Sequence, residues 1–250
     1  MTLFSMRMLA VLAATQLFLL ACTSNDQNKP SSATTSDTAG KETSTTPATT
    51  TPTSTIVTSP QAMLIVRHKV KDFTAWKMAY DGHDSARMSS GLHNYVIGRG
   101  ATDSSTVLVA LKADDMAKAK AFAKSSGLKQ AMQKGGVMGT PTVQFITMTF
   151  QDTARIGATL RSETTFKVKG WTAWEKSFKE GEQERIDNGI VVRAYGHDAD
   201  DSNQVRLVTA LTDTAKAYAY WKSDQLKKRR AASGVLTTPE RFVFRIVQRY

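Results

Sequence analysis

After residue 60, the spacing of hydrophobic positions changes from that of a strand to that of a helix. Residues 62–70, AMLIVRHKV, form an apolar run rich in branched side chains, which predicts a strand. A helix is predicted from Asp72, whose carboxylate can accept hydrogen bonds from the first turn, to about Ser90. Gly91 then suits the left-handed turn that ends many helices.

The same two spacings continue to residue 150. Turn-forming residues at 98–105 separate two apolar runs, and Asp115 can cap a second helix. The expected elements are strands at 62–70, 92–99, 106–111 and 143–150, and helices at about 73–90 and 116–134. This β-α-β-β-α-β order within about 90 residues is the ferredoxin-like plan.

The second half of the chain repeats the first at a displacement of 98 positions. His68–Trp76 is repeated as Phe166–Trp174, and the ungapped run Lys69–Pro141 matches Lys167–Pro239 at 26 of 73 positions. Such self-similarity indicates an internal structural repeat. We therefore predict an α+β fold made of two tandem ferredoxin-like repeats.

One strand indicates how the repeats pack. Residues 107–111, VLVAL, are continuously apolar, so both faces of that strand should be covered. Helices cover one face, and the sheet of the other repeat can cover the second. We expect two sheets packed face to face, which is a pseudo-dimeric α/β barrel within one chain, and hence a monomer.

Two basic segments near the C-terminus leave alternatives open. In residues 241–250 Phe242, Phe244 and Ile246 alternate with Arg241, Arg245 and Arg249, so the aromatic side should face the core. We favour a charged edge strand over an anion-binding surface, because charge on edge strands prevents aggregation. Residues 227–230, KKRR, are interpreted first as a solvated helix face and second as a contact with anionic lipid.

The N-terminus predicts export and a lipid anchor. Arg7 precedes the apolar run 8–20, whose 13 residues are too few to span a membrane as a helix. Leu19-Leu20-Ala21-Cys22 resembles a bacterial lipobox, so residues 1–22 are expected to be a signal peptide and Cys22 to be acylated. Thr23 is not the acidic residue that retains lipoproteins in the inner membrane, so the outer membrane of the bacterial cell envelope is expected.

Composition divides the rest of the chain. Of the 38 residues at 23–60, 20 are Ser or Thr, which predicts a disordered tether. The repeats are expected at 61–151 and 152–250.

The net charge is concentrated in the repeats. Residues 1–22 carry +1 and residues 23–60 carry −1, so the repeats hold the full net charge of +11. This charge favours anionic partners, although a solvated basic surface explains it as well. Export argues against nucleic acid.

Candidate chemistry lies along the first predicted helix. Its stripe has a 3-4-3-4 spacing that places the side chains within an arc of about 80°. The stripe consists of Phe73, Trp76, Tyr80, His83 and Arg87, and its second copy of Trp171, Trp174, Phe178, Gly181 and Arg185. The aromatic residues and the arginine are kept, whereas the histidine is not.

Each residue of the stripe has a structural and a functional interpretation. Trp76 and Trp174 suit packing between helix and sheet, or contact with a ligand. Arg87 and Arg185 suit either a helix-end charge in water or recognition of a carboxylate. His83 suits acid–base chemistry near neutral pH, or a hydrogen-bonded structural role.

The sequence lacks the motifs of several other kinds of functional site. The remaining histidines do not fall at metal-ligand spacings, and no glycine-rich phosphate loop or serine nucleophile elbow is present. The single cysteine, Cys22, excludes an internal disulfide. We expect no metal and no cofactor.

The motifs DFxAW, HxxxR, DxAKAxA, SxxLK and GVxxxP together resemble the dimeric α/β-barrel family that includes antibiotic-biosynthesis-monooxygenase-like domains. The resemblance covers Met63–Phe150 and Leu160–Tyr250. It implies the barrel fold. Relatives include cofactor-free monooxygenases, haem-degrading enzymes and proteins without a known reaction. The residues that bind haem in the second group have no match here.

Three functions remain open. The first is a lipoprotein that binds a small aromatic or anionic molecule between helix and sheet, using Trp76, Tyr80, His83 and Arg87, with Trp174 and Arg185 in the second copy. The second is a cofactor-independent monooxygenase-like or isomerase-like enzyme, with His83 as base and Arg87 stabilising an enolate-like charge. The third is a non-catalytic scaffold.

Replacing Cys22 by Ser should leave the exported protein unacylated and soluble, because the thiol that receives the lipid is gone. Intact mass and membrane fractionation measure this. Retention of the Cys22→Ser protein in the membrane fraction would contradict the lipid anchor.

Overall fold

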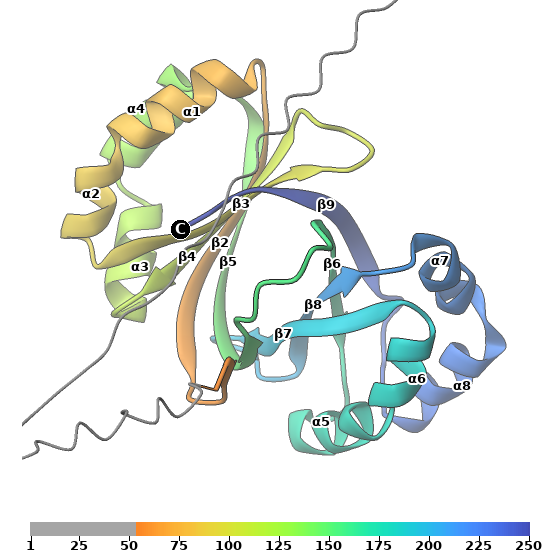
Figure 1. Ribbon diagram of the computed structural model, residues 1–250. Helices are drawn as coiled ribbons and strands as arrows, with labels where there is room; N and C mark the ends of the chain where they lie inside the picture. Colours follow the sequence, from red (N-terminus) through yellow and green to blue (C-terminus); the bar gives the residue numbers. More distant parts are fainter. Residues whose placement is uncertain (1–53) are drawn as a thin grey trace, which may run out of the picture. The chain divides into compact units, whose positions relative to one another are not determined.

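The computed structural model describes residues 54–250 (Figure 1). The predicted signal peptide, Cys22 and most of the predicted tether lie outside the described residues. Between residues 54 and 250, no helix combines the length and apolar character needed to cross a membrane.

Repeat 1 begins after the short strand β1 (Ile56–Val57) and contains four strands and four short helices. Its elements are β2 (Gln61–Val70), α1 (Phe73–Gly82), α2 (Asp84–Ser89), β3 (Leu92–Gly100), β4 (Thr106–Ala113), α3 (Met116–Ala123), α4 (Ser126–Lys134) and β5 (Val137–Asp152). All four predicted strands are present, and the last is longer than predicted.

Repeat 2 has the same order of elements. They are β6 (Leu160–Lys167), α5 (Trp171–Glu180), α6 (Glu182–Asp187), β7 (Ile190–Asp198), β8 (Gln204–Leu211), α7 (Thr214–Lys222), α8 (Asp224–Ala232) and β9 (Glu240–Arg249). The capping prediction holds for Asp72 and Asp115, whose carboxylates accept from the backbone N–H groups of Ala75 and Lys118.

The predicted continuous helices are wrong, because each is broken once. The first stops at Gly82, and α2 starts again after His83, whose N–H bonds back to Tyr80 O in a tighter turn. The second is interrupted at Ser125, which is extended (φ −68°, ψ 146°) and caps α4 with its own side chain. A serine that bonds to the neighbouring backbone competes with the helix, so it starts a new one.

The strands close into a barrel. The order around it is β5-β2-β4-β3-β9-β6-β8-β7, and β7 pairs back onto β5. Within each repeat the sheet is antiparallel, and two seams join the repeats, β3–β9 and β5–β7. This confirms the predicted α+β fold, two tandem ferredoxin-like repeats in one pseudo-dimeric α/β barrel. The two sheets meet through hydrogen-bonded edges as well as through their inner faces.

The prediction that residues 241–250 form an edge strand is wrong. The strand β9 pairs with β3 on one side and with β6 on the other. Its aromatic side does face the core, because Phe244 is buried and Phe242 and Ile246 pack against the same cluster. The predicted arginine side does not stay on one face. Arg241 lies over the ring of Trp221 in α7, and Arg245 is exposed. Arg249 lines the inside of the barrel with Phe244, because the register between β9 and β3 shifts between Ile246 and Gln248. Alternation along a strand identifies its two faces only up to such a shift, and it does not show what covers them.

Two hydrophobic layers confirm that the strand at 107–111 is covered on both faces. Val107, Val109 and Leu111 belong to the cluster beneath the helices of repeat 1, together with Trp76 and Phe122. Leu108 and Ala110 point the other way, into a cluster inside the barrel that also holds Met63, Ile65, Ile146, Met148 and Phe244. The helices thus cover the outer face of each sheet (Figure 1).

Equivalent glycines allow the strands to approach at the two seams. Gly98 in β3 faces Phe244 of β9, and a Cβ at this position would lie 2.3 Å from the phenyl ring. Gly196 in β7 is its counterpart in repeat 2, where a Cβ would lie 2.2 Å from the carbonyl oxygen of Thr147. A backbone atom cannot move aside as a side chain can, so a larger residue should be tolerated less well at position 196 than at position 98.

Gly196→Ala should therefore lower the free energy of unfolding by about 1–3 kcal/mol, the range seen when a packed interior receives an extra carbon. Chemical denaturation measures the change. Gly82→Ala is the matched control, since a Cβ at Gly82 meets nothing within 4 Å and alanine favours the helix by about 1 kcal/mol. Equal stability of the two variants would contradict the tight β5–β7 seam.

Candidate functional site

Each repeat contains a cavity between its helices and the outer face of its sheet. The repeat-1 cavity has a volume of about 50 Å³ and is lined by Trp76, Tyr80, His83 and Arg87, with apolar residues and His68 around them. The repeat-2 cavity has a volume of about 80 Å³ and includes Trp174 and Arg185 in its lining. Most of the stripe therefore lies at two separate cavities, with Trp76, Tyr80, His83 and Arg87 at one and Trp174, Phe178 and Arg185 at the other. The first residue of each stripe, Phe73 or Trp171, lines neither cavity.

The tryptophans form the aromatic floor of these cavities. Trp76 is buried and stacks on Tyr80 with ring centres 5.1 Å apart, and Trp174 stacks on Phe178 at 4.9 Å. The rings join helix to sheet, as the packing interpretation expects, and their remaining faces line the cavities.

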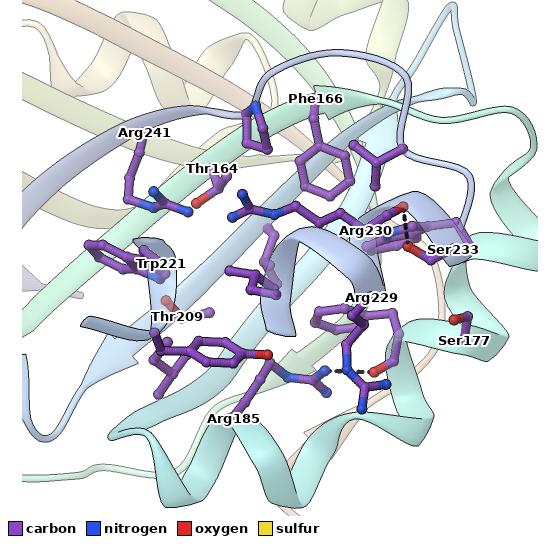
Figure 2. A pocket seen from close by; sticks show the side chains of 18 residues that line it. Thr164, Phe166, Ser177, Arg185, Thr209, Trp221, Arg229, Arg230, Ser233 and Arg241 are labelled. Carbon is purple, nitrogen blue, oxygen red and sulfur yellow. Dashed lines mark hydrogen bonds between the residues drawn. The ribbon is translucent and has the colours of Figure 1, made fainter. Parts of the chain in front are cut away.

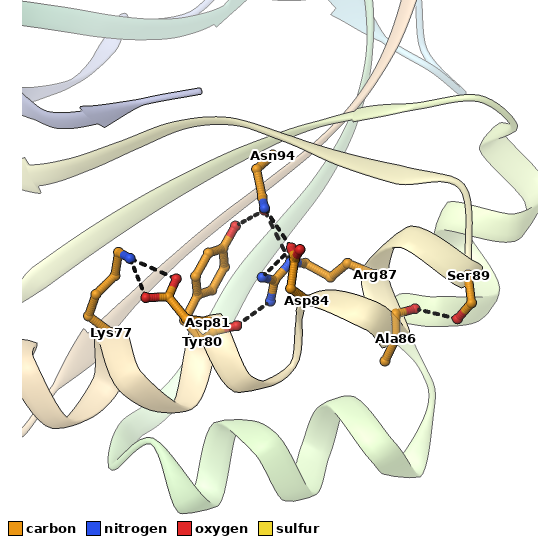
Figure 3. Close-up of polar contacts among 8 residues, drawn as sticks. All are labelled: Lys77, Tyr80, Asp81, Asp84, Ala86, Arg87, Ser89 and Asn94. Atoms are coloured by element: carbon orange, nitrogen blue, oxygen red, sulfur yellow. Dashed lines mark hydrogen bonds and ion pairs between the residues drawn. The ribbon is translucent and has the colours of Figure 1, made fainter.

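Arg87 is tied into a closed polar network (Figure 3). Its Nη1 donates to Tyr80 O at 2.7 Å, its Nε to Asn94 Oδ1 at 3.1 Å and its Nη2 to Asp84 Oδ1 at 3.0 Å. The guanidinium carbon lies 3.7 Å from the centre of the Tyr80 ring. Only 3% of Arg87 is exposed, so a helix-end charge held in water is the wrong interpretation. The residue bridges the break between α1 and α2.

Arg185 repeats part of this geometry. Its Nη1 donates to Phe178 O at 2.7 Å, and its guanidinium carbon lies 3.8 Å from the centre of the Phe178 ring. It has no counterpart of Asn94, and its buried Nε has no hydrogen-bond partner among the described residues. The Nε–H group of Arg185 can therefore donate a hydrogen bond to a ligand, whereas that of Arg87 already donates to Asn94.

Two arginine side chains crowd the repeat-2 position that corresponds to the stripe histidine. His83 corresponds to Gly181, and a Cβ there would lie 3.0 Å from Arg185 Nη1 and 3.1 Å from Arg229 Nη1. Arg229 comes from α8 and donates its Nε to Glu184 Oε2 at 2.9 Å. The space that the imidazole occupies in repeat 1 is thus taken by guanidinium groups in repeat 2.

The His83 ring packs against Phe122 with ring centres 5.9 Å apart. Burial and the nearby charge of Arg87 lower its pKa. A lowered pKa keeps the ring neutral at pH 7, the form that accepts a proton.

His68 also faces the repeat-1 cavity and was not among the predicted site residues. It is 7% exposed, and neither ring nitrogen has a partner among residues 54–250. Its ring centre lies 5.6 Å from that of Trp76, the same spacing as between Phe166 and Trp174 in repeat 2. A histidine therefore occupies the place of a core phenylalanine.

Arginines that the sequence assigned to surface roles line the repeat-2 cavity (Figure 2). Figure 2 shows the guanidinium groups of Arg230, from α8, and Arg241, from β9, turned toward each other near Thr164. Arg241 packs on Trp221 with its guanidinium carbon 3.9 Å from the ring centre. In the KKRR segment the two lysines are exposed, as the solvated-face interpretation expects, whereas Arg229 and Arg230 are half-buried and line the cavity.

The repeat-2 cavity is lined by more arginines than acids near it can pair. No Asp or Glu is among its lining residues, and the nearby Glu184 pairs with Arg229, not with Arg230 or Arg241. Burial lowers the pKa of Arg185 to about 10, and burial together with the charge of Arg230 lowers that of Arg241 to about 10. These values remain well above 7, so both groups are charged at neutral pH. Buried charges without a partner are costly, and an anion would relieve that cost.

Comparison with known proteins supports the fold. No family model matches the chain, and no curated protein matches it. Among solved structures, a protein of Fusobacterium nucleatum subsp. nucleatum provisionally described as a monooxygenase has a TM-score of 0.51 at 14% identity, over 77% of this chain and 94% of that one. A Lactobacillus acidophilus protein with the same provisional description has a TM-score of 0.50 at 10% identity, over 75% and 94%. An anthrone oxidase-like protein has a TM-score of 0.52 at 12% identity, over 77% and 94%. The chain therefore shares the dimeric α/β-barrel fold of these proteins.

His68 should make stability depend on pH. Burial lowers its pKa from 6.5 to about 4, so the unfolded chain binds more protons than the folded protein between these values. The free energy of unfolding should fall as the pH drops from about 6.5 to about 4, by up to ~3 kcal/mol from this residue. His68→Phe, which copies repeat 2, should remove that loss in denaturation curves recorded at several pH values. His93→Gln, at an exposed site, is the control and should lose as much stability as the parent. If His68→Phe also loses as much stability as the parent between pH 6.5 and pH 4, His68 is not a buried neutral ring.

Proposed function

We propose that this protein is an exported, lipid-anchored binding protein that holds a small organic anion, a carboxylate, in the repeat-2 cavity. The observation that carries the proposal is the convergence of Arg185, Arg230 and Arg241 on an aromatic-floored cavity without an acidic lining residue. Guanidinium groups match the two oxygens of a carboxylate, and the neighbouring rings suit the organic part of the ligand.

The size of the cavity limits the ligand. Its volume of about 80 Å³ is smaller than the ~150 Å³ of a cavity that takes one benzene ring. A carboxylate group and a few carbon atoms fit the cavity as it stands, and a single aromatic ring requires side chains to move. Large polycyclic molecules are not expected ligands.

The proposal also covers where the protein is located and its oligomeric state. The lipobox-like sequence at 19–22 supports attachment to the bacterial outer membrane, and the run at 23–60 supports a tether between lipid and barrel. The match of 26 of 73 positions between repeats supports an origin by tandem duplication. Because both seams are closed within one chain, a monomer is sufficient for the barrel.

A second candidate is a cofactor-independent monooxygenase-like or isomerase-like enzyme that uses the repeat-1 cavity. The lowered pKa of His83 supports this candidate, because a neutral imidazole facing an apolar cavity can act as a base. Its proposed partner Arg87 already donates to Asn94, Tyr80 and Asp84. Stabilising an enolate would require breaking that network, so binding in repeat 2 is the better supported function.

Titration with benzoate, followed by calorimetry, tests the binding function. Arg241→Leu should weaken benzoate binding at least about tenfold, because a hydrogen bond to a charged group contributes about 1.5–3 kcal/mol. Arg245→Leu is the matched control: it removes the same charge from the same strand, four positions on, where the side chain is exposed and does not line the cavity. Its affinity should equal that of the parent.

If Arg241→Leu binds benzoate as tightly as the parent protein does, benzoate does not bind in the repeat-2 cavity. Two results together would remove the proposed carboxylate ligand and leave the scaffold as the simplest function. These are no binding of millimolar benzoate to the parent protein, and equal binding of propionate, a carboxylate without a ring, by Arg241→Leu and Arg245→Leu.

A further inference from the structure

A third cavity lies inside the barrel, away from the helices. It has a volume of about 70 Å³ and is lined by residues from each of the strands β2 to β9, with no helical residue among them. Its lining includes apolar side chains, among them Met63, Met148, Phe244 and Ile246, and a polar group made of Gln151, Asp152, Arg161, Glu163, Arg193 and Arg249. This interior is separate from the two cavities beneath the helices.

Comparison of the repeats shows that the fold does not require these charges. At a displacement of 98, Arg161, Glu163, Arg193 and Arg206 correspond to Met63, Ile65, Tyr95 and Leu108. Repeat 1 therefore builds the same wall from apolar and aromatic side chains, and Met63, Ile65 and Leu108 are buried in the interior cluster. A buried charge that the architecture can replace with methionine or leucine points to a role other than packing.

The charges do not balance among themselves. Asp152 pairs with Arg193, and Glu163 pairs with Arg206. Arg161 is 3% exposed and donates only to the backbone oxygens of Ala158 and Leu160. Arg249 has no side-chain hydrogen bond or ion pair within residues 54–250. Two guanidinium groups are thus left without a counter-charge.

Unpartnered donors face the same space. Gln151 is 2% exposed, and its Nε2 has no partner within the part of the chain that the structure describes; the same holds for Nε of the buried Arg193. Gln151 and Arg249 occupy equivalent positions in the two seams, since Gln151 pairs with Ala194 and Arg249 with Val96. Burial, and to a smaller extent the charges of Arg193 and Arg249, also lower the pKa of Arg161 to about 10.

We propose that the barrel interior is a second binding site, specific for a short aliphatic monocarboxylate held by Arg161, Arg249 and Gln151. The two oxygens of a carboxylate match these donors, and Met63, Met148 and Phe244 provide an apolar wall for a short alkyl chain. The carboxylate of Asp152 disfavours a dianion. This site is independent of the repeat-2 cavity, because none of its lining residues is shared with that cavity.

Methyl-¹³C methionine NMR tests the site directly. Met63 and Met148 line the cavity, Met132 lines the repeat-1 cavity, and Met78 is exposed. Titration with butyrate at constant pH and ionic strength should shift the Met63 and Met148 methyl signals saturably and leave Met132 and Met78 unchanged. Arg249→Leu should weaken this binding at least about tenfold, whereas the exposed-site control Arg245→Leu should not.

Gln151→Leu provides a second variant, because it replaces an unpartnered buried amide by an apolar group of similar size. It should stay folded and bind butyrate several-fold more weakly. Absence of a saturable shift at Met63 and Met148 in the parent overturns the proposal, as does equal butyrate affinity in Arg249→Leu and the parent. Arg241→Leu should leave the butyrate-dependent shifts of Met63 and Met148 unchanged, because Arg241 does not line this cavity. These signals therefore test the interior site independently of the repeat-2 cavity.

Discussion

The structure depends on hydrogen bonding between the two repeats at the β3–β9 and β5–β7 seams. A four-stranded ferredoxin-like sheet leaves two edges of unpaired N–H and C=O groups and an apolar inner face. Joining the repeats at both edges satisfies these groups and buries both inner faces in one step. The seams have the same register in both copies, and each contains a glycine where the strands approach most closely.

Closure also determines where ligands can bind. Two of the cavities among residues 54–250 lie outside the barrel, beneath the helices, and another lies inside it. The repeats share a backbone plan but differ in the chemistry of these spaces. Repeat 1 keeps an apolar cavity with His68 and His83, whereas repeat 2 gathers arginines both beneath its helices and inside the barrel. The pseudo-symmetric frame thus supports sites that are not symmetric.

The hydrophobic spacing and the internal repeat were sufficient to predict the strands, the ferredoxin-like order and the barrel, because burial of both faces of 107–111 required a second sheet. The stripe Trp76, Tyr80, His83 and Arg87 was correctly placed beside one cavity. The break at Ser125 was missed because a side-chain cap outweighed the helical spacing around it. Arg230 and Arg241 were missed because local alternation does not distinguish water from a helix layer. Their convergence depends on contacts between elements that are distant in sequence.

Native-state hydrogen exchange tests the seams most directly. If closure of the barrel at the two seams stabilises the fold, the amides paired across β3–β9 and β5–β7 should exchange only when the whole protein unfolds. Their free energy of opening should then equal that of the amides in the β2–β4 pair inside repeat 1. Rapid exchange at both seams through partial opening, while the β2–β4 amides stay protected, would show that the repeats are stable separately and would contradict the account.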